Sequence, residues 1–466
     1  MFDFSTYLDR IVCVTSDGEQ FTYRELEKQA ILLGKHMTAG ELTFLLCKNT
    51  FEALVGYVAA LHAHSPALLL NAEIEGTLLA RLVEVYQPKQ IWMPISVLER
   101  TRIETYDTCL AMGDYVLVQS KLSHVPLPDE LAILLTTSGS TGSPKLVRLS
   151  RQNLMANANS IREYLNINQN ERPITSLPMY YSYGLSVINS HLIVGATLLL
   201  TNDSYVQQSF WNFAKEQNAT SFAGVPYTYE MLKKLKVMRF DLPMMRTFTQ
   251  AGGKLSLDLI RYFVKTTQEQ GKRFVVMYGQ TEATARMSYV PDVYAMEKLG
   301  SVGIAIPDGA FSIEQDGHIV SWPNEIGELV YQGPNVCLGY ANSREDLYKG
   351  DENRGVLHTG DVAYRDGDGF IYIVGRMKRF LKLFGNRISL DYAESLIKQQ
   401  YGIDVACVGT DNKMIVYTTD VAHLEDIHKF ISMTTHIQHS AFEVRHIDAI
   451  PHSDSGKVQY NSLSNI

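Results

Sequence analysis

The sequence predicts an α/β protein with a large N-terminal body of α/β subdomains, a small β-rich lobe, and a small mobile α+β lid domain at the C-terminus. Short apolar runs alternate with amphipathic helical segments up to about residue 300. Clusters of Gly, Asp and Asn then separate short alternating segments, which is typical of hairpins. A basic segment, Gly375–Ile388, precedes a last compact unit. We therefore expect an N-terminal domain of residues 1–376 and a C-terminal domain of residues 377–466.

The composition is that of an ordinary globular protein. The chain has 466 residues, of which 45% are hydrophobic and 20% are charged, and its formal net charge is -8. A chain of this length and composition can bury large cores, which excludes disordered and fibrous classes. An acidic chain also lacks the basic footprint of a nucleic-acid-binding protein, so we expect no nucleic acid partner.

The cysteines and the apolar runs indicate a cytoplasmic protein without a membrane span. The N-terminus lacks the basic and apolar pattern of a secretory signal. The apolar runs are shorter than the ~20 residues that cross a bilayer. A dispersed, odd set of cysteines without a CxxC pair fits a reducing compartment. These cysteines are Cys13, Cys47, Cys109, Cys337 and Cys407.

In the N-terminal half, a helix is predicted over Phe21–Gly40, because Thr22 and Glu25 have the spacing of a capping box. Buried strands are predicted at Leu131–Leu135 and Leu146–Leu149. Ser150 opens a second helix, whose apolar residues form one stripe through Leu165.

Further along the chain, the alternation of strands, loops and helices continues. It covers Thr220–Leu235 and Arg273–Glu282, followed by a strand at Phe370–Val374. Two helices, Asp391–Gln400 and Leu424–Met433, are predicted in the C-terminal unit.

The first chemically suggestive stretch is TTSGSTGSPK, Thr136–Lys145, directly after a predicted buried strand. Small hydroxyl and glycine residues let backbone N–H groups approach an anion, and Lys145 adds a positive charge. The spacing differs from a Walker A loop because Ser143 and Pro144 separate Gly142 from the lysine. The alternative is a polar surface loop.

Four other stretches are weaker signals when each is taken alone. In YGQTEAT, Tyr278–Thr284, a glutamate could hold Mg²⁺, although a glutamate at a strand end is usually solvated or paired. In HTGD, His358–Asp361, a carboxylate could bind ribose hydroxyls, or the segment could be a simple turn. The basic segment could face a nucleotide or solvent. The SGK sequence near the C-terminus places Lys457 at the tip of a turn.

Together with AGGK, Ala251–Lys254, these stretches follow one another in an order that resembles the adenylate-forming (AMP-binding) superfamily. This superfamily contains acyl-CoA synthetases, aryl-CoA ligases, luciferases and the adenylation domains of peptide synthetases. The similarity covers nearly the whole chain, including Phe21–Ala30 and Gly327–Tyr340. It implies an ATP- and Mg²⁺-dependent enzyme that converts a carboxylic acid to an acyl-adenylate, releases pyrophosphate, and transfers the acyl group to a pantetheine thiol.

The resemblance also implies a role for individual residues. Lys457 would be the lysine of the adenylation step, Thr281 would touch the α-phosphate, and Glu282 would help to hold the metal. Lys378 would be the hinge, with Lys382 and Gly385 on the face used for thioester formation. The remaining nucleotide-binding residues would be Thr137, Ser138, Gly139, Ser140, Thr141, Gly142, Lys145, Ala251, Gly252, Gly253, Tyr278, Gly279, Gln280, Asp361 and Arg376. Asp361 would take the ribose hydroxyls, with Arg376 beside it.

The segment that opens the acyl pocket in this family matches Tyr181, Ser182, Tyr183 and Gly184. Many acyl- and aryl-CoA ligases have a histidine where this chain has Tyr181. Amino-acid-activating relatives place an aspartate where this chain has Ser182, and an ammonium group there would lose its usual partner. We therefore expect an acyl or aryl acid rather than an α-amino acid.

Weaker signals concern the aromatic and polar residues near this segment. Tyr227 and Tyr229, together with Tyr181 and Tyr183, either line the pocket for an aryl or hydroxylated acid or simply pack in the core. Asn189 and His191 are expected to pack.

The thiol acceptor is either free CoA or the phosphopantetheine arm of a separate acyl carrier protein, with a slight preference for the carrier. Alternative functions are a stand-alone amino-acid-adenylating enzyme that loads a carrier, and a catalytically silent nucleotide-binding scaffold. A luciferase-like oxygenase would consume O₂ after adenylation, and a kinase would form ADP instead of AMP and pyrophosphate.

Overall fold

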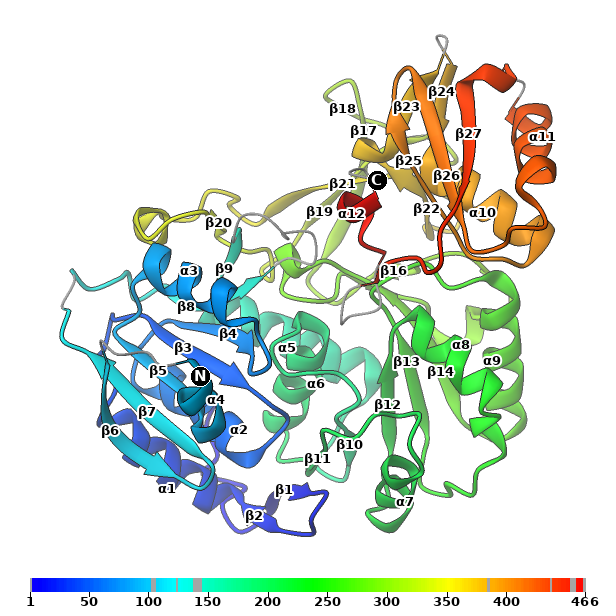
Figure 1. The fold of residues 1–466 in the computed structure, drawn as a ribbon. Coiled ribbons are helices and arrows are strands. Elements are labelled where there is room, and N and C mark those ends of the chain that lie inside the picture. Colours follow the sequence, from blue (N-terminus) through cyan, green and yellow to red (C-terminus); the bar gives the residue numbers. More distant parts are fainter. Residues whose placement is uncertain are drawn as a thin grey trace. The chain divides into compact units, whose positions relative to one another are not determined.

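The structure is a computed structural model that describes residues 2–101, 106–122, 125–136, 145–383, 386–435, 438–452 and 458–463 (Figure 1). The chain divides into two compact units. The first contains Met1–Leu299, Ala305–Ala310 and Gln332–Leu357, and the second contains Gly300–Ile304, Phe311–Tyr331 and His358–Ile466. The expected domain boundary beside Arg376 lies within the second unit and stays a prediction about where the lid begins.

The first unit contains two large sheets. In one of them the strands follow the order β20-β9-β8-β4-β3-β5-β7-β6. Its central strands are parallel and buried along their length, which explains why their sequences are continuous apolar runs. The strands predicted after residues 130 and 145 are confirmed as β8 and β9. The bounds are β3 Thr43–Cys47, β4 Ala67–Asn71, β5 Gln90–Pro94, β6 Tyr106–Met112, β7 Tyr115–Ser120, β8 Leu131–Thr136, β9 Leu146–Ser150 and β20 Gly339–Ala341.

Helix α1 (Tyr23–Gly34) shows what local sequence determines and what it does not. Thr22 forms the predicted capping box with Glu25, so the start of the helix is confirmed. The predicted end at Gly40 is wrong, because α1 ends at Gly34. The backbone N–H of Gly40 donates to the carbonyl of His64, and its carbonyl accepts from Leu127. These distant partners draw the chain out of the helix. Its neighbours are α2 (Phe51–His62), α3 (Gly76–Tyr86) and α4 (Ile95–Thr101).

The second sheet has the strand order β16-β15-β14-β13-β12-β10-β11-β1-β2. Strands β12, β13 and β14 are parallel and in register, so their carboxyl ends meet at one edge. The AGGK and YGQTE segments both follow strands at this edge, where ligands bind in open α/β sheets. The bounds are β1 Ile11–Thr15, β2 Gln20–Thr22, β10 Pro173–Ile174, β11 Leu198–Leu200, β12 Ser221–Gly224, β13 Thr247–Gln250, β14 Arg273–Tyr278, β15 Ser288–Tyr289 and β16 Ile304–Ala305.

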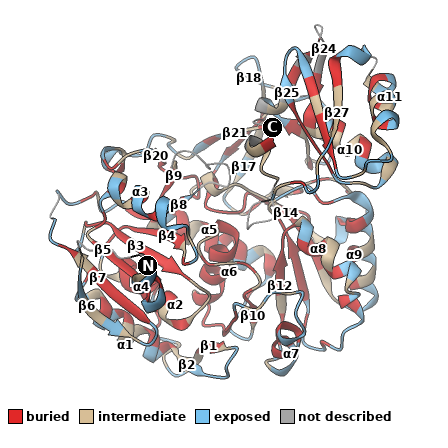
Figure 2. Ribbon diagram, viewed as in Figure 1, coloured by how far each residue is buried: buried red, intermediate tan, exposed pale blue. Residues whose placement is uncertain are grey.

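Helices cover the second sheet and leave its strands buried, while their outer faces are exposed (Figure 2). Ser150 caps α5 with a capping box, as predicted. The helix bounds are α5 Arg151–Leu165, α6 Ser182–Leu192, α7 Gln208–Glu216, α8 Pro226–Lys234 and α9 Leu257–Glu269.

The second unit contains the β-rich lobe and the C-terminal α+β segment. The lobe is a sheet of order β18-β17-β19-β21-β22, and the C-terminal segment has the short sheets β23-β24 and β25-β26-β27. Both helices predicted after residue 390 are confirmed as α10 and α11. The bounds are β17 Ala310–Gln315, β18 His318–Ile319, β19 Gly327–Gln332, β21 Val356–Arg365, β22 Ile371–Arg376, β23 Phe380–Leu383, β24 Asn386–Ser389, α10 Leu390–Tyr401, β25 Val405–Thr410, β26 Lys413–Thr418, α11 Leu424–Thr435, β27 Phe442–His446 and α12 Tyr460–Leu463.

Two observations bear on the expected environment of the protein. All five cysteines are free. No helix in the described part of the chain combines the length and the apolar character needed to cross a membrane.

Candidate active site

The YGQTE segment leaves the carboxyl end of β14 and turns at once into a short 3₁₀ helix, Thr281–Ala283. Gly279 is required at the turn, because a Cβ there would lie 1.8 Å from the carbonyl oxygen of Ala285. The backbone carbonyl of Glu282 accepts a hydrogen bond from the N–H of Cys337, 2.8 Å away. The turn is therefore anchored by its own close backbone packing and by a hydrogen bond from the segment before β20. This anchoring fixes the direction in which the side chains of Thr281 and Glu282 leave the backbone.

Glu282 is held by Tyr340 on β20. The Tyr340 hydroxyl donates to Oε1 of Glu282 over 2.9 Å. Burial and the nearby Glu282 carboxylate raise the pKa of Tyr340, so this hydroxyl keeps its proton. Nζ of Lys145 lies 3.2 Å from the centre of the same ring, which is a cation–π contact. Tyr340 thus brings together a predicted metal carboxylate and a predicted phosphate-binding lysine.

This arrangement is compatible with Mg²⁺. The ion usually takes one or two protein carboxylates together with substrate phosphates and water. Glu282 retains Oε2, to which Tyr340 does not donate, for such a role. No group of three or more His, Cys, Asp or Glu side chains suited to a metal occurs in the described ranges. Glu282 is accordingly a carboxylate that fits Mg²⁺ bound jointly with phosphates.

The predicted acyl-pocket segment begins α6 and lies beside the same turn. Oγ of Ser182 and Oγ1 of Thr281 are 3.2 Å apart, within hydrogen-bonding distance. A Cβ on Gly252 would lie 2.8 Å from the Tyr181 hydroxyl, so the glycine permits close packing of the AGGK loop. The described part of the first unit therefore brings four predicted residues close together: Tyr181, Ser182, Gly252 and Thr281.

Other members of the predicted set occupy the same loops. The Ala251 N–H donates to the carbonyl of Gly224, and the Gln250 side chain donates to the carbonyl of Gly253 over 2.9 Å. Tyr278 and Gln280 flank Gly279 and contact each other through Nε2 of Gln280 and the Tyr278 hydroxyl, 3.4 Å apart. These contacts order the loops at the sheet edge around one site.

In the second unit, Asp361 and Arg376 face each other on the antiparallel strands β21 and β22. Nε of Arg376 donates to Oδ1 of Asp361 over 3.0 Å. The Asp361 side chain is 3% exposed, whereas that of Arg376 is 58% exposed. The resemblance placed these two residues side by side, and the structure does so; their binding of ribose stays a prediction.

Several predicted residues lie outside the described part of the chain. They are Thr137, Ser138, Gly139, Ser140, Thr141, Gly142, Gly385 and Lys457. Lys378 and Lys382 are placed as backbone, in a 3₁₀ helix (Met377–Arg379) and in β23, but their side chains are outside the description. Their roles therefore stay predictions.

The four tyrosines near the predicted pocket differ in their burial. Tyr229 is fully buried among phenylalanine rings, and its hydroxyl donates to the carbonyl of Thr249, so it packs in the core. Tyr227 is 48% exposed. Tyr183 is buried on α6 and donates to Oγ1 of Thr249 over 2.8 Å. Burial raises the pKa of Tyr181 to about 12.

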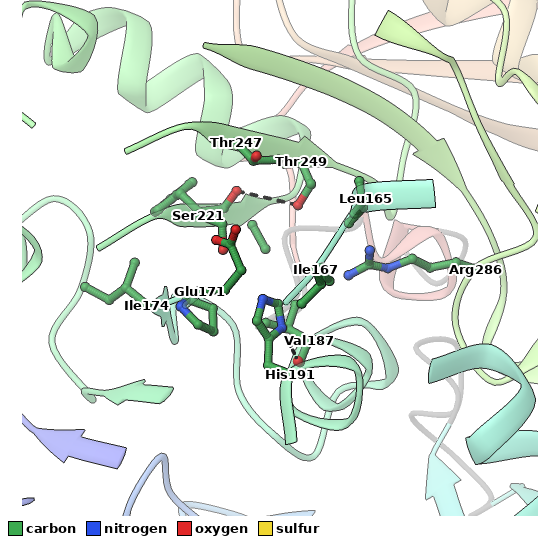
Figure 3. Close-up of a pocket in the computed structure, with 13 residues that line it drawn as sticks. Leu165, Ile167, Glu171, Ile174, Val187, His191, Ser221, Thr247, Thr249 and Arg286 are labelled. Carbon is green, nitrogen blue, oxygen red and sulfur yellow. Dashed lines mark hydrogen bonds between the residues drawn. The ribbon is translucent and has the colours of Figure 1, made fainter. Parts of the chain in front are cut away.

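Asn189 packs as expected, because its Oδ1 accepts from the buried Tyr57 hydroxyl. His191 is different: it is buried, yet its ring borders an internal cavity (Figure 3). Burial lowers its pKa to about 4, so the ring is neutral at physiological pH.

Two contributors to the site were missed by sequence reasoning. Tyr340 lies 58 residues from Glu282, within a stretch noted only for its family resemblance. Arg286 follows the YGQTE segment and is 2% exposed. The only signal for Arg286 was an arginine between a chemically suggestive loop and the short strand β15.

Comparison with known proteins places this arrangement in a family. The model of the family described as AMP-binding enzyme matches residues 4–341, more than half of the chain. The chain belongs to this family, as the order of its motifs predicted.

Individual relatives are distant but match along most of the chain. The chain is 27% identical over 461 residues to an oxalate–CoA ligase of Arabidopsis thaliana, covering 90% of this chain and 87% of the ligase. It resembles the structure of O-succinylbenzoate coenzyme A synthetase from Bacillus subtilis in complex with AMP, with a TM-score of 0.80 and 22% identity over 99% of this chain and 97% of that one. A complex of that synthetase with ATP and magnesium ion gives a TM-score of 0.77 and 22% identity, covering 98% and 96%. These structures confirm the predicted fold.

Proposed function

We propose that this protein is an AMP-forming acid–thiol ligase. It activates an acyl or aryl carboxylic acid with ATP and transfers the acyl group to the thiol of CoA or of a carrier-protein pantetheine. The observation that carries the proposal is the cluster formed by Thr281, Glu282, Tyr340 and Lys145 beside Ser182, in a chain of the AMP-binding family. It supports the proposal because the lysine predicted to bind phosphate and the glutamate predicted to bind the metal lie near the opening of the predicted acid pocket.

In the first step, a carboxylate oxygen forms a bond to the α-phosphorus of ATP, and the bond from that phosphorus to pyrophosphate breaks. Both reactants are anions, so the site has to offset their repulsion. Mg²⁺, when bound, neutralises charge on the phosphates. Tyr340 orients Glu282, and the cationic Lys145 lies against the same tyrosine ring, so that both are positioned for the phosphates.

In the second step, the thiol loses its proton to solvent and its sulfur forms a bond to the acyl carbon of the adenylate. The bond from that carbon to the phosphate oxygen breaks, and AMP leaves with the bonding electron pair. Lys457 acts in the first step and moves away before the second, while the face containing Lys382 and Gly385 replaces it. The hinge for this motion is at Lys378. This part of the proposal rests on the family resemblance and on the separation of the chain into two units.

The preference against an α-amino acid rests on Ser182. Its side chain is 7% exposed and carries no charge. An ammonium group buried beside it would lack the carboxylate that offsets the cost of desolvation. The free cysteines favour a reducing cytoplasmic location for the reaction.

The proposal is tested by acid-dependent exchange of labelled pyrophosphate into ATP, with aliphatic, aryl and amino acids, and by trapping of the adenylate with hydroxylamine. Exchange with acids that lack an α-amine supports the proposal. Exchange with amino acids alone would show that the interpretation of Ser182 is wrong. ADP as the product would indicate a kinase, and the absence of any product with every acid would favour the silent scaffold. Repeating the active case with CoA and with a pantetheinylated carrier identifies the acceptor.

Two substitutions connect the reaction to the site. Lys457→Ala should abolish exchange and leave ATP binding intact. Glu282→Gln should lower exchange about 100-fold, because it removes the charge that holds the metal on the phosphates. An unchanged exchange rate in Lys457→Ala would overturn the assignment of that lysine.

A further inference from the structure

An internal cavity lies in the first unit, between α6 and the strands β10, β12 and β13 (Figure 3). Its volume is about 30 Å³, enough for a few water-sized atoms. Val187 and His191 of α6, Thr249 of β13 and Arg286 are among the residues that line it. The lining is mixed, because apolar side chains such as Val187 lie beside polar groups of His191, Thr249 and Arg286.

The most unusual of these groups is the guanidinium of Arg286. Figure 3 shows it directed toward the other lining residues. Its Nη1 donates to the Tyr164 hydroxyl over 3.2 Å and to the sulfur of Met277, and its Nε is buried without a partner. Among the described residues, no carboxylate forms an ion pair with Arg286. Burying a charge costs several kcal/mol unless an opposite charge offsets it, so this arginine lacks an anion.

The backbone around Arg286 is fixed firmly. Its carbonyl accepts from the side-chain amides of Asn157 and Asn335, over 2.9 and 3.2 Å. Two residues earlier, Thr284 has a φ of 67°, which is rare for a β-branched residue, and its hydroxyl donates to the carbonyl of Asn335. Strained, well-anchored backbone of this kind is concentrated at ligand sites.

The other charged groups at the cavity do not supply the missing anion. Glu171 also lines the cavity, but Arg246 donates to its Oε1 over 2.8 Å and the Thr220 hydroxyl donates to its other oxygen. Its charge is therefore already balanced. His191 is neutral, because burial lowers its pKa to about 4, and its Nδ1 donates to the carbonyl of Val187. One uncompensated positive charge, that of Arg286, remains at the cavity.

Helix α6 connects this cavity to the reacting end of the site. Ser182, at the start of the helix, lies against Thr281, and Tyr183 lies under the guanidinium, with 4.9 Å between Cζ of Arg286 and the ring centre. Val187 and His191 line the cavity five and nine residues after Ser182. At 1.5 Å per residue these positions are about 7 to 14 Å further along the axis. An acid that pairs with Arg286 while it reacts beside Thr281 therefore has to lie along the first part of α6.

We propose that Arg286 binds a second carboxylate on the acid substrate, and that the enzyme therefore activates a dicarboxylic acid. One carboxylate reacts beside Thr281, and the other forms a charge-assisted pair with the guanidinium. The proposal rests on the proposed function, and it adds the chemical class of the substrate. None of the residues predicted to bind the nucleotide lines the cavity, so we expect an anion other than the phosphates of ATP to complete the site.

The test compares dicarboxylic acids with monocarboxylic acids of the same length, in the wild type and in Arg286→Met. Pyrophosphate exchange in the wild type should favour the dicarboxylic acid by at least about 100-fold in kcat/KM, because a monocarboxylic acid leaves the buried charge unpaired. Arg286→Met should remove this preference. Arg286→Lys keeps the charge but not the bidentate geometry, so it should restore part of the preference for the dicarboxylic acid. In addition, the dicarboxylic acid alone should raise the thermal midpoint of the wild type and not that of Arg286→Met.

Arg344→Met is a matched control, since Arg344 is another buried arginine of this unit whose donors are used by the carbonyls of Tyr86 and Gln87 and by Glu41. It should lower stability without changing the preference between acids. Equal use of both acid classes by the wild type, with an unchanged ratio in Arg286→Met, would overturn the inference and leave the proposed function intact. A thermal shift with ATP alone that Arg286→Met abolishes would also overturn it. If no acid supports exchange, the proposed function fails, and the thermal shift with the dicarboxylic acid still decides whether the site binds it.

Discussion

Two arginines, one buried in the first unit and one partly buried in the second, have similar aromatic neighbours and opposite electrostatic surroundings. Arg286 in the first unit lies over the ring of Tyr183 and has no carboxylate partner among the described residues. Arg379 in the second unit lies 3.5 Å over the ring of Tyr460 and forms ion pairs with both Asp391 and Glu394. The Arg379 cluster is complete without a ligand, which is the condition expected of a structural network. The Arg286 site is not complete, because it lacks an anionic partner.

The position of the Arg379 cluster gives it a structural task near the proposed moving parts. Arg379 directly follows the predicted hinge Lys378, and Tyr460 comes three residues after Lys457. The Tyr460 hydroxyl donates to Oε2 of Glu394 over 3.0 Å, while Oε1 accepts from Arg379 and from the N–H of Cys407. The cluster thus connects the hinge segment, α10, β25 and the start of α12 within one unit.

The largest expected effect is a difference in stability between the two units when the guanidinium of each arginine is removed. Arg379→Met should destabilise the second unit by about 3–5 kcal/mol, because it leaves two carboxylates partly buried without their cation. Arg286→Met should leave the stability of the first unit unchanged or raise it, because it removes an unpaired buried charge. Urea unfolding of the full-length protein, followed by peptide-resolved hydrogen exchange, separates the two units. A comparable loss in both variants would contradict the distinction between the two arginines.

A second, smaller effect is a pH dependence that differs in sign between the units. Burial, together with the charge of Asp391, raises the pKa of Glu394 to about 7. In the unfolded chain this carboxyl titrates near 4.3. Between these values the unfolded state has lost the proton that the folded state keeps, so raising the pH lowers the stability of the second unit. The expected loss is about 3 kcal/mol across this window.

For His191 in the first unit, the direction is reversed. Burial lowers its pKa to about 4, while in the unfolded chain it titrates near 6.5. Lowering the pH through this window therefore protonates the unfolded state first and destabilises the first unit. Hydrogen exchange measured between pH 5 and 8 checks, for each unit, whether its stability rises or falls with pH. Glu394→Gln should flatten the slope of the second unit only, and an unaltered slope in that variant would show that another group is responsible.

The sequence predicted the parts of this molecule that depend on neighbours along the chain. Thr22 and Ser150 were identified as helix caps from a spacing of three residues, and both form their capping boxes. Asp361 and Arg376 were placed side by side through the family resemblance, and they face each other across two adjacent strands. In these cases the partners are close in sequence or fixed by a motif of the family.

Contacts between distant segments were not predictable from the sequence. The end of α1 depends on the contact of Gly40 with Leu127, 87 residues later, and the orientation of Glu282 depends on Tyr340. The missing ion pair of Arg286 is still harder to predict, because it depends on which carboxylates the fold leaves far from the guanidinium. Hydrophobic pattern predicts that a strand is buried, but not which charged groups its neighbours will contain.

The smallest predicted effect concerns the two tyrosines that lie under these arginines. Tyr460→Phe removes a hydrogen bond to the carboxylate of Glu394, and Tyr183→Phe removes one to the neutral hydroxyl of Thr249, while both rings are retained. Bonds to charged groups contribute about 1.5–3 kcal/mol and neutral ones about 1 kcal/mol. Tyr460→Phe should therefore lower the free energy of unfolding by about 2 kcal/mol and Tyr183→Phe by about 1 kcal/mol, measured by urea unfolding at pH 8. At that pH the Glu394 carboxyl is ionised, since its pKa is about 7. Equal losses would mean that the Tyr460 hydroxyl gains nothing from the charge of its partner, and the Arg379 cluster would then be less tightly coupled than its geometry indicates.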